Sequence, residues 1–81
     1  MIKEISLIEA YNFLLSGMII MNEFGLSIWY DKSDDKIKEL IDLGDENYGA
    51  DTIKFTKSEF LNIRDKNEKF YIDLAHLKYT K

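Results

Sequence analysis

The chain has 81 residues, a net charge of −4 and no cysteine. We expect a single domain over residues 1–81, and because a chain this short buries only about 60% of its unfolded surface, a homo-oligomer would add useful buried area. The lack of cysteine excludes disulfides and thiolate zinc sites, and the negative charge argues against direct binding of nucleic acid in a broad basic groove.

The most apolar run covers residues 13–21, which is too short to cross a bilayer and contains a central glycine, Gly17. Glu4 and Glu9 precede this run, unlike the basic start of a secretion signal. We therefore expect no membrane association and a cytoplasmic location.

A helix is predicted over residues 6–16. Ser6 is a suitable N-cap, and Glu9 three residues later completes a capping box. Apolar residues follow at helical spacing, so one face of this helix is expected to enter the core. Gly17 can take the left-handed conformation that ends a helix.

The next segment reads as a β-hairpin, with strands at 18–22 and 26–30 and a turn in which Gly25 adopts positive φ. Trp29 and Tyr30 are adjacent, so they point to opposite faces of the sheet. Trp29 either packs in the core, which we prefer, or contacts a partner, since tryptophan is common at interface hot spots.

A short helix is the preferred prediction for 34–43, with Ser33 as its cap and Gly44 beyond its end. A strand over 37–43 is the alternative, because short apolar runs fit either period.

The last third alternates between strand and helix signals. We predict strands at 52–56 and 70–79, and a brief helix at 57–62 that opens with a second capping box, Thr56 and Glu59. Strands joined by short turns indicate an α+β fold, in which the N-terminal helix packs on a small, mostly antiparallel sheet with one or two further short helices.

The sequence offers little for catalysis or metal binding. His76 is the only histidine, and no nucleophile–base pair is evident, so we expect no enzyme activity and no catalytic residue. Residues 31–42 begin like a calcium loop, but Lys36 stands where glycine is needed and Asp42 where glutamate is needed. We therefore expect no metal and no cofactor.

The middle of the chain is strongly acidic. Residues 31–51 hold eight acids and three lysines, a local net charge of −5. This segment is either a solvated surface or a patch that meets a basic groove on a partner protein. The candidate partner-binding residues are Asp34, Asp35, Asp42, Asp45, Glu46, Tyr48 and Trp29.

Two stretches resemble small phage counter-defence proteins of the Thoeris anti-defence and anti-CRISPR-related type. The first has the form S/T-x-x-E-A-x-x-x-L-x-x-G and runs from Ser6 to Gly17, followed by a β-branched strand. The second comprises 55–61, Phe-Thr-Lys-Ser-Glu-Phe-Leu, and the later 70–72, Phe-Tyr-Ile.

The resemblance implies a phage-encoded or mobile-element-encoded protein that acts against a bacterial defence effector, such as a CRISPR nuclease complex. In combination with the acidic segment, we expect it to block a basic nucleic-acid-binding site. The alternative is an oligomeric sponge that sequesters a nucleotide immune signal, with Trp29, Tyr30 and Tyr48 stacking on a base and Arg64 or Lys54 meeting phosphates.

Overall fold

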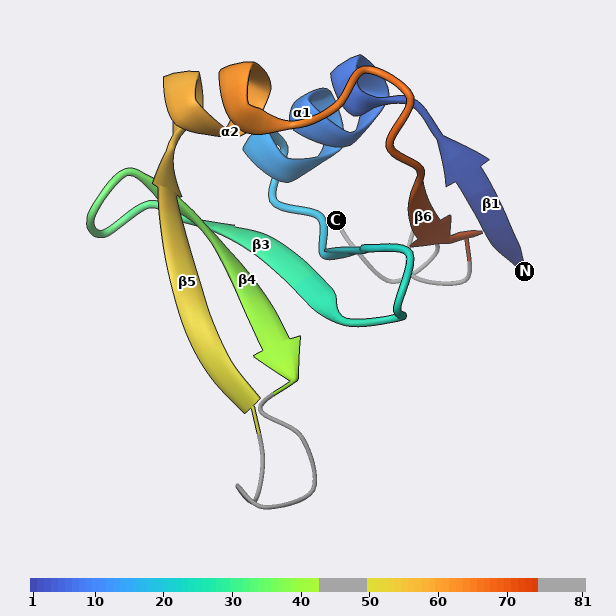
Figure 1. Cartoon of the computed structure of the whole chain (residues 1–81), viewed down its shortest axis with the longest axis horizontal. Helices are drawn as coiled ribbons and strands as arrows, with labels where there is room; N and C mark the ends of the chain where they lie inside the picture. The colour runs from blue at the N-terminus through green and yellow to red at the C-terminus, as the bar shows by residue number, and fades with distance from the viewer. Residues whose placement is uncertain (43–49, 75–81) are drawn as a thin grey trace.

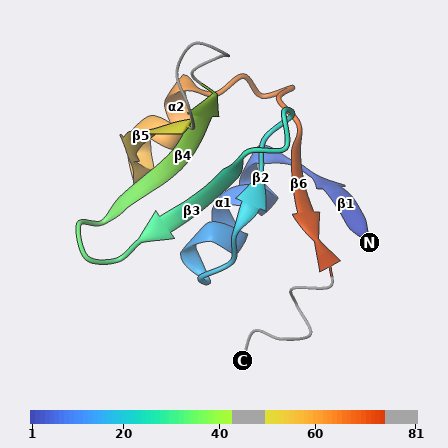
Figure 2. The same ribbon diagram turned by 90° about the horizontal axis from the view of Figure 1, so that it is seen from below.

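In the described residues, six antiparallel strands form one sheet, and two helices cover one of its faces (Figure 1). The computed structural model describes residues 1–42 and 50–74. In chain order the elements are β1 (Ile2–Ile5), α1 (Leu7–Leu15), β2 (Ile20–Met21), β3 (Ser27–Asp31), β4 (Lys36–Asp42), β5 (Ala50–Thr56), α2 (Lys57–Ile63) and β6 (Phe70–Asp73). The strands lie in the order β1-β6-β2-β3-β4-β5 (Figure 2), which confirms the α+β prediction.

Helix α1 begins and ends as predicted. Ser6 Oγ accepts a hydrogen bond from the Glu9 backbone N–H at 3.2 Å, and the Ser6 backbone N–H donates to Glu9 Oε1 at 2.9 Å. Both partners of the capping box are therefore present at the N-terminus. At the other end Gly17 has a φ of +96°, in the left-handed region where an L side chain is strained.

The predicted hairpin is formed by β2 and β3, with Ile20 opposite Ile28. Asn22 closes its turn from a buried position, because Asn22 Oδ1 accepts from the backbone N–H groups of Phe24 and Leu26. Gly25 has the expected positive φ, +79°. Two backbone hydrogen bonds, from Asn22 N–H to the Leu26 carbonyl and from Gly25 N–H to the Asn22 carbonyl, close the same turn.

The helix predicted over 34–43 is wrong, and the strand alternative is correct. Strand β4 lies between β3 and β5. It pairs with β5 along its length and with β3 over residues 36–39, so strands on both sides satisfy the backbone groups of its first half. Ile37 and Glu39 alternate inward as strand residues do. Asp35, expected in the first helical turn, instead sits in the β3–β4 turn with a φ of +57°.

Strand β1 is an element that the sequence did not reveal. It pairs with β6, with Ile5 opposite Phe70, and the buried side chain in it is Ile5. With so little alternation in burial, the segment lacks the period-two pattern that identifies a strand. The last predicted strand, 70–79, is confirmed over its first residues as β6, and 75–79 with His76 lie outside the described residues.

The core lies between the inner face of the sheet, which faces the helices, and the helices themselves. Helix α1 packs on β2, β3 and β6, and α2 packs on β4 and β5. Phe60 of α2 is fully buried, with its ring centroid 6.3 Å from that of Phe55 and 5.8 Å from that of Phe70. The buried apolar residues are Ile5, Leu7, Ala10, Leu14, Met18, Ile20, Ile28, Ile37, Phe60, Phe70 and Ile72.

Candidate functional site

The turn between β3 and β4 presents two of the predicted partner-binding acids, Asp34 and Asp35. Asp31 organises this turn, because its Oδ1 accepts from both the backbone N–H and the hydroxyl of Ser33. Lys38 Nζ lies 2.6 Å from Asp31 Oδ2 and 3.1 Å from Asp34 Oδ2. These contacts, Lys38 first, lower the pKa of Asp31, and the two carboxylates raise the pKa of Lys38.

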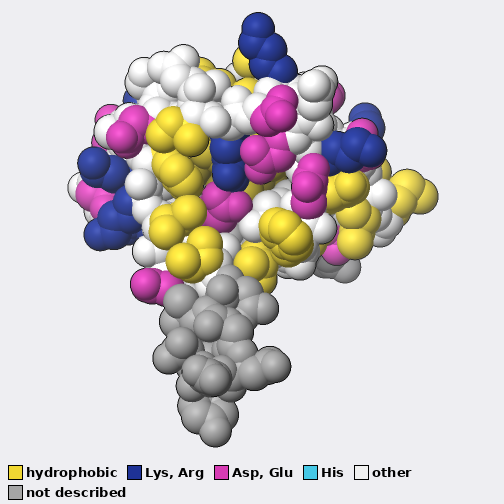
Figure 3. All heavy atoms as spheres, viewed as in Figure 1, with side chains coloured by type: hydrophobic (Ala, Val, Ile, Leu, Met, Phe, Trp, Pro, Cys, Tyr) yellow, Lys and Arg dark blue, Asp and Glu magenta, His cyan; other side chains and the backbone are white. Residues whose placement is uncertain are grey.

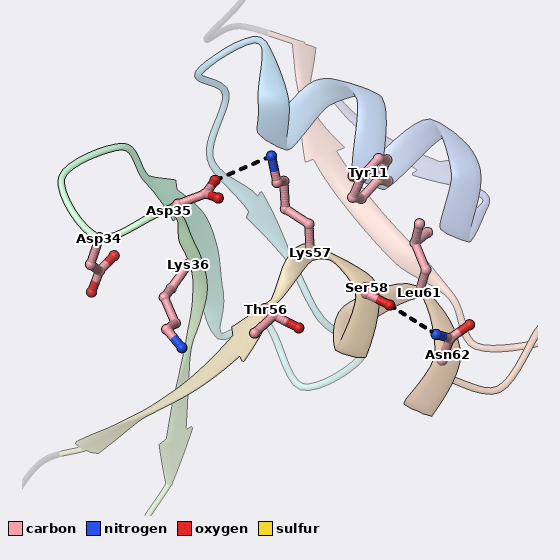
Figure 4. A pocket seen from close by; sticks show the side chains of 9 residues that line it. All are labelled: Tyr11, Asp34, Asp35, Lys36, Thr56, Lys57, Ser58, Leu61 and Asn62. Carbon is pink, nitrogen blue, oxygen red and sulfur yellow. Dashed lines mark hydrogen bonds and ion pairs between the residues drawn. The ribbon is translucent and has the colours of Figure 1, made fainter.

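Asp35 faces away from that pair and towards the helices. It accepts a hydrogen bond from the Tyr30 hydroxyl, and Lys57 Nζ at the start of α2 lies 3.2 Å from Asp35 Oδ1 (Figure 4). The bond from Tyr30 and then that from Lys57 lower the pKa of Asp35, whereas Asp35 raises the pKa of both partners. Tyr30 and Lys57 therefore stay protonated and suit binding rather than proton abstraction.

A pocket of about 600 Å³ lies beside Asp35, between the turn and the two helices (Figure 4). Its lining combines charged and hydroxyl groups with two larger side chains, Tyr11 and Leu61. Two pairs of polar groups in this lining contact each other: Lys57 with Asp35, and Asn62 Nδ2 with Ser58 Oγ at 3.1 Å. These groups are therefore already partnered within the protein.

The structure separates those predicted acidic residues that it describes. Asp34 and Asp35 are at one end of β4 and Asp42 is its last residue at the other end, a separation of about 20 Å at the usual rise of a strand. Asp45, Glu46 and Tyr48 lie outside the described residues.

Trp29 lies on the outer face of the sheet, away from the helices. Its neighbour in β3, Ile28, is fully buried on the inner face, so Trp29 points the other way. It is partly buried and does not belong to the core. Trp29 is opposite Lys38, which is opposite Lys54 in β5. The preferred core position is therefore not observed, and a contact with a partner stays a prediction.

A second group of polar residues, which the sequence analysis did not single out as a site, is buried on the inner face. Glu39 of β4 is 4% exposed. Its Oε1 accepts from Arg64 Nη1 at 2.9 Å and from Arg64 Nη2 at 2.5 Å, and its Oε2 accepts from Asn22 Nδ2 at 2.8 Å. The carboxylate is thus paired and hydrogen-bonded from both sides, as a buried charge requires.

Three aromatic rings surround the guanidinium of Arg64. Its Cζ lies 5.4 Å from the ring centroid of Phe55, 5.0 Å from that of Phe60 and 5.3 Å from that of Phe70, within the range of cation–π contact. The side chain of Arg64 is 10% exposed, and its Nε has no hydrogen-bond partner in the described structure. Arg64 is therefore committed to the protein interior and is not placed to bind a phosphate.

Glu68 adds a second carboxylate beside Arg64, with Oε2 3.4 Å from Nη1. Partial burial raises the pKa of Glu68, the nearby Glu39 and Glu23 carboxylates add to this, and Arg64 opposes it. Negative charge thus exceeds positive charge here.

These residues form part of the wall of a pocket of about 470 Å³, which we call the Glu39–Arg64 pocket. It is lined by Asn22, Glu23, Phe24, Leu26, Glu39, Leu40, Ile41, Ile53, Arg64 and Glu68. On the face seen in Figure 3, apolar side chains flank acidic and basic ones over the middle of the sheet, below the helices.

One sequence signal could have revealed this site. In a strand over 37–43, Glu39 takes an inward position between Ile37 and Ile41, where a charge needs a partner. The single arginine, Arg64, is the partner best suited to a buried carboxylate. The preference for a helix over this segment concealed the pattern.

The groups proposed for nucleotide binding that lie within the described residues, all except Tyr48, are not brought together. Trp29 and Lys54 are on the outer face, while Tyr30 and Arg64 face the core and are already bonded to Asp35 and Glu39. Across residues 1–42 and 50–74, no three histidine or carboxylate side chains are grouped closely enough to hold a metal ion. Neither described helix is long and apolar enough to cross a membrane.

Comparisons with protein-family models, with curated proteins and with solved structures found no match to this chain. The resemblance to counter-defence proteins therefore stays a prediction from the sequence motifs, and the chemistry of the site rests on the geometry described above.

Proposed function

We propose that this protein is a phage-encoded or mobile-element-encoded inhibitor. In this proposal it acts in the cytoplasm of a host bacterium, where it blocks a defence effector such as a CRISPR nuclease complex by presenting acidic side chains to a basic nucleic-acid-binding site. The observation that carries the proposal is the exposed β3–β4 turn, which presents Asp34 and Asp35 with different lysine partners, Lys38 and Lys57. The resemblance of the terminal motifs supplies the biological context.

The ion pairs of the turn do not prevent such binding. The side chains of Asp34 and Asp35 are 36% and 61% exposed. Lys57 is also well exposed, so its pair with Asp35 contributes little net stability because water solvates both charges, and a basic group on a partner can replace it. Lys38 is more buried and stays with Asp31 and Asp34, but the exposed part of the Asp34 carboxylate can accept a further donor. The net charge of −4 would also steer the protein towards a positive surface.

The test is restoration of phage infection in bacteria that carry a CRISPR nuclease system. We expect the wild-type protein to raise plating efficiency, and the double variant Asp34→Lys with Asp35→Asn to lose this effect. Asparagine is chosen because it tolerates the positive φ of Asp35. Glu4→Lys is the control, since it changes an exposed carboxylate on β1, far from the turn in the sheet order.

Two results would contradict the proposal. One is an equal plating efficiency of phage on cells that make the wild type and on cells that make the double variant. The other is purification from phage-infected cells with a bound nucleotide and no protein partner, which would favour the signal-sequestering alternative.

A further inference from the structure

The Glu39–Arg64 pocket lies beside the end of α2, against residues of β4, β5 and the β2–β3 turn. Cross-strand pairing places Ile28, Glu39 and Ile53 in one row. Ile28 is fully buried, whereas Ile53 is only partly buried. Arg64, the residue after α2, closes the top of this row over Glu39. Charged side chains and apolar side chains together line the opening that remains.

The charge of this pocket favours a cation. Three carboxylates, those of Glu23, Glu39 and Glu68, line it together with one guanidinium. Both terminal nitrogens of Arg64 already bond Glu39, so little positive charge is available to an anion. A partly buried carboxylate such as Glu68 interacts more strongly with an added cation than a fully solvated one does.

Hydrogen-bonding capacity points to the same chemistry. Glu39 Oε2 accepts a single described hydrogen bond, from Asn22, and a carboxylate oxygen can accept two. The Arg64 Nε–H also lacks a described partner, but this atom is itself buried and takes no part in the proposed contact. A cationic side chain of a peptide would supply the further donor for Glu39 Oε2 and the positive charge for Glu68.

The apolar walls favour a long side chain. Leu26, Ile41 and Ile53 line the pocket, and Phe24 stands at its rim with 85% of its surface exposed. Lysine and arginine bury an aliphatic stem against apolar surface while the charged head meets polar groups, and a guanidinium also stacks on an aromatic ring.

We propose that the Glu39–Arg64 pocket binds an arginine or lysine side chain of a partner protein, with its stem against Phe24 and Ile53 and its charged head at Glu68 and Glu39. The pocket proposal rests on the proposed inhibitor function in one respect, that the partner has a basic protein surface. It adds to that function an anchoring contact that lies away from the β3–β4 turn.

The test is an NMR titration of the ¹⁵N-labelled full chain with the peptide acetyl-Gly-Leu-Arg-Gly-amide. We expect saturable shifts at the amides of Phe24, Leu26 and Ile53, a lowered pKa of the Glu68 carboxyl, and weaker binding at high salt. The charge-reversed peptide acetyl-Gly-Leu-Glu-Gly-amide should produce none of these.

Variants make the test specific. Glu68→Gln and Phe24→Ala should each weaken binding roughly tenfold, the effect of losing one charge-assisted or aromatic contact. Glu4→Gln, which also removes one carboxylate, should leave affinity unchanged. Phe24 is so exposed that its loss does not threaten folding.

Shifts centred on residues 31–35, equal affinity of both pocket variants and wild type, or binding of the acidic peptide at the same amides would each overturn the inference. The two proposals fail separately. If the peptide binds in the pocket but the protein does not restore phage infection, the pocket proposal stands and the inhibitor function is rejected. Protection that survives Phe24→Ala and Glu68→Gln but not changes at Asp34 and Asp35 would reject the pocket alone.

Discussion

Arg64 donates from both terminal nitrogens to Glu39, although 25 residues separate the two in the sequence. The pair joins the end of α2 to the middle of β4, and three phenylalanine rings surround its guanidinium. It is at once the main polar contact within the inner layer and the wall of the proposed pocket.

Removing one partner of this pair should strongly destabilise the protein. Glu39→Ala and Arg64→Ala each leave a buried charge without its counterpart, and we expect a loss of about 3–5 kcal/mol in the free energy of unfolding. The double variant Glu39→Met with Arg64→Met should recover most of this loss, because two apolar side chains need no partner. Urea unfolding of the single and double variants measures the coupling, and additive losses would contradict it.

The left-handed conformation of Gly17 gives a second prediction. A Cβ at this position would meet no atom within 4 Å, so the effect of Gly17→Ala comes from the backbone alone. We expect a loss of roughly 1–2 kcal/mol in the free energy of unfolding, the penalty of an L residue in this region. Gly17→Asn should lose less, since asparagine tolerates positive φ. Equal stability of all three proteins would show that the helix end is not held in this conformation.

The two capping boxes should make stability depend on pH. Hydrogen bonds from Ser6 and Thr56 lower the pKa of Glu9 and Glu59 below the ordinary value of 4.5. A lowered native pKa means that the stabilisation is present above pH 4.5 and is lost as the pH falls through the native values.

Thermal unfolding between about pH 6 and pH 3 measures this effect. The wild type should lose more stability over this interval than the double variant Glu9→Gln with Glu59→Gln, whose caps do not titrate. Parallel curves for the two proteins would contradict the prediction.

The fourth prediction concerns the β3–β4 turn. Lys38 is the first cause of the lowered pKa of Asp31, so Lys38→Met should raise the pKa of that carboxyl towards its ordinary value. Lys32→Met, in the same turn, removes an exposed lysine that is not the cause and is the matched control. Carboxyl ¹³C NMR titration measures the pKa of Asp31 in both variants. An unchanged pKa in Lys38→Met would mean that the hydrogen bonds from Ser33 alone lower it.

The sequence predicted correctly those features that depend on interactions between residues close together in the chain. The capping residues Ser6 and Thr56, and the glycines Gly17 and Gly25, act within a few residues of themselves, and the structure has them as expected. Strands β1 and β4 depend on partners distant in sequence. Ile37 fits either a helix or a strand until β3 and β5 are seen on both sides of it.

The candidate site shows the same limit. Asp34 and Asp35 could be picked out from the acidic composition of the segment, although the preferred prediction had them at the start of a helix and the structure has them in a turn between strands. The pairing of Glu39 with Arg64 could not, because it requires both the inward face of β4 and the position at which α2 ends. The separation of Asp42 from Asp34 likewise follows from the strand that lies between them.

The position of β6 between β1 and β2 has a consequence for how the molecule assembles. During synthesis from the N-terminus, β1 is made before the other described strands, yet its neighbour in the sheet, β6, is made after all of them. Ile2–Ile5 therefore has no strand to pair with until residue 73 has left the ribosome. The hairpin of β2 and β3 and the arm of β3, β4 and β5 can form earlier, so closure of the sheet by β1 is expected to be the last event of folding.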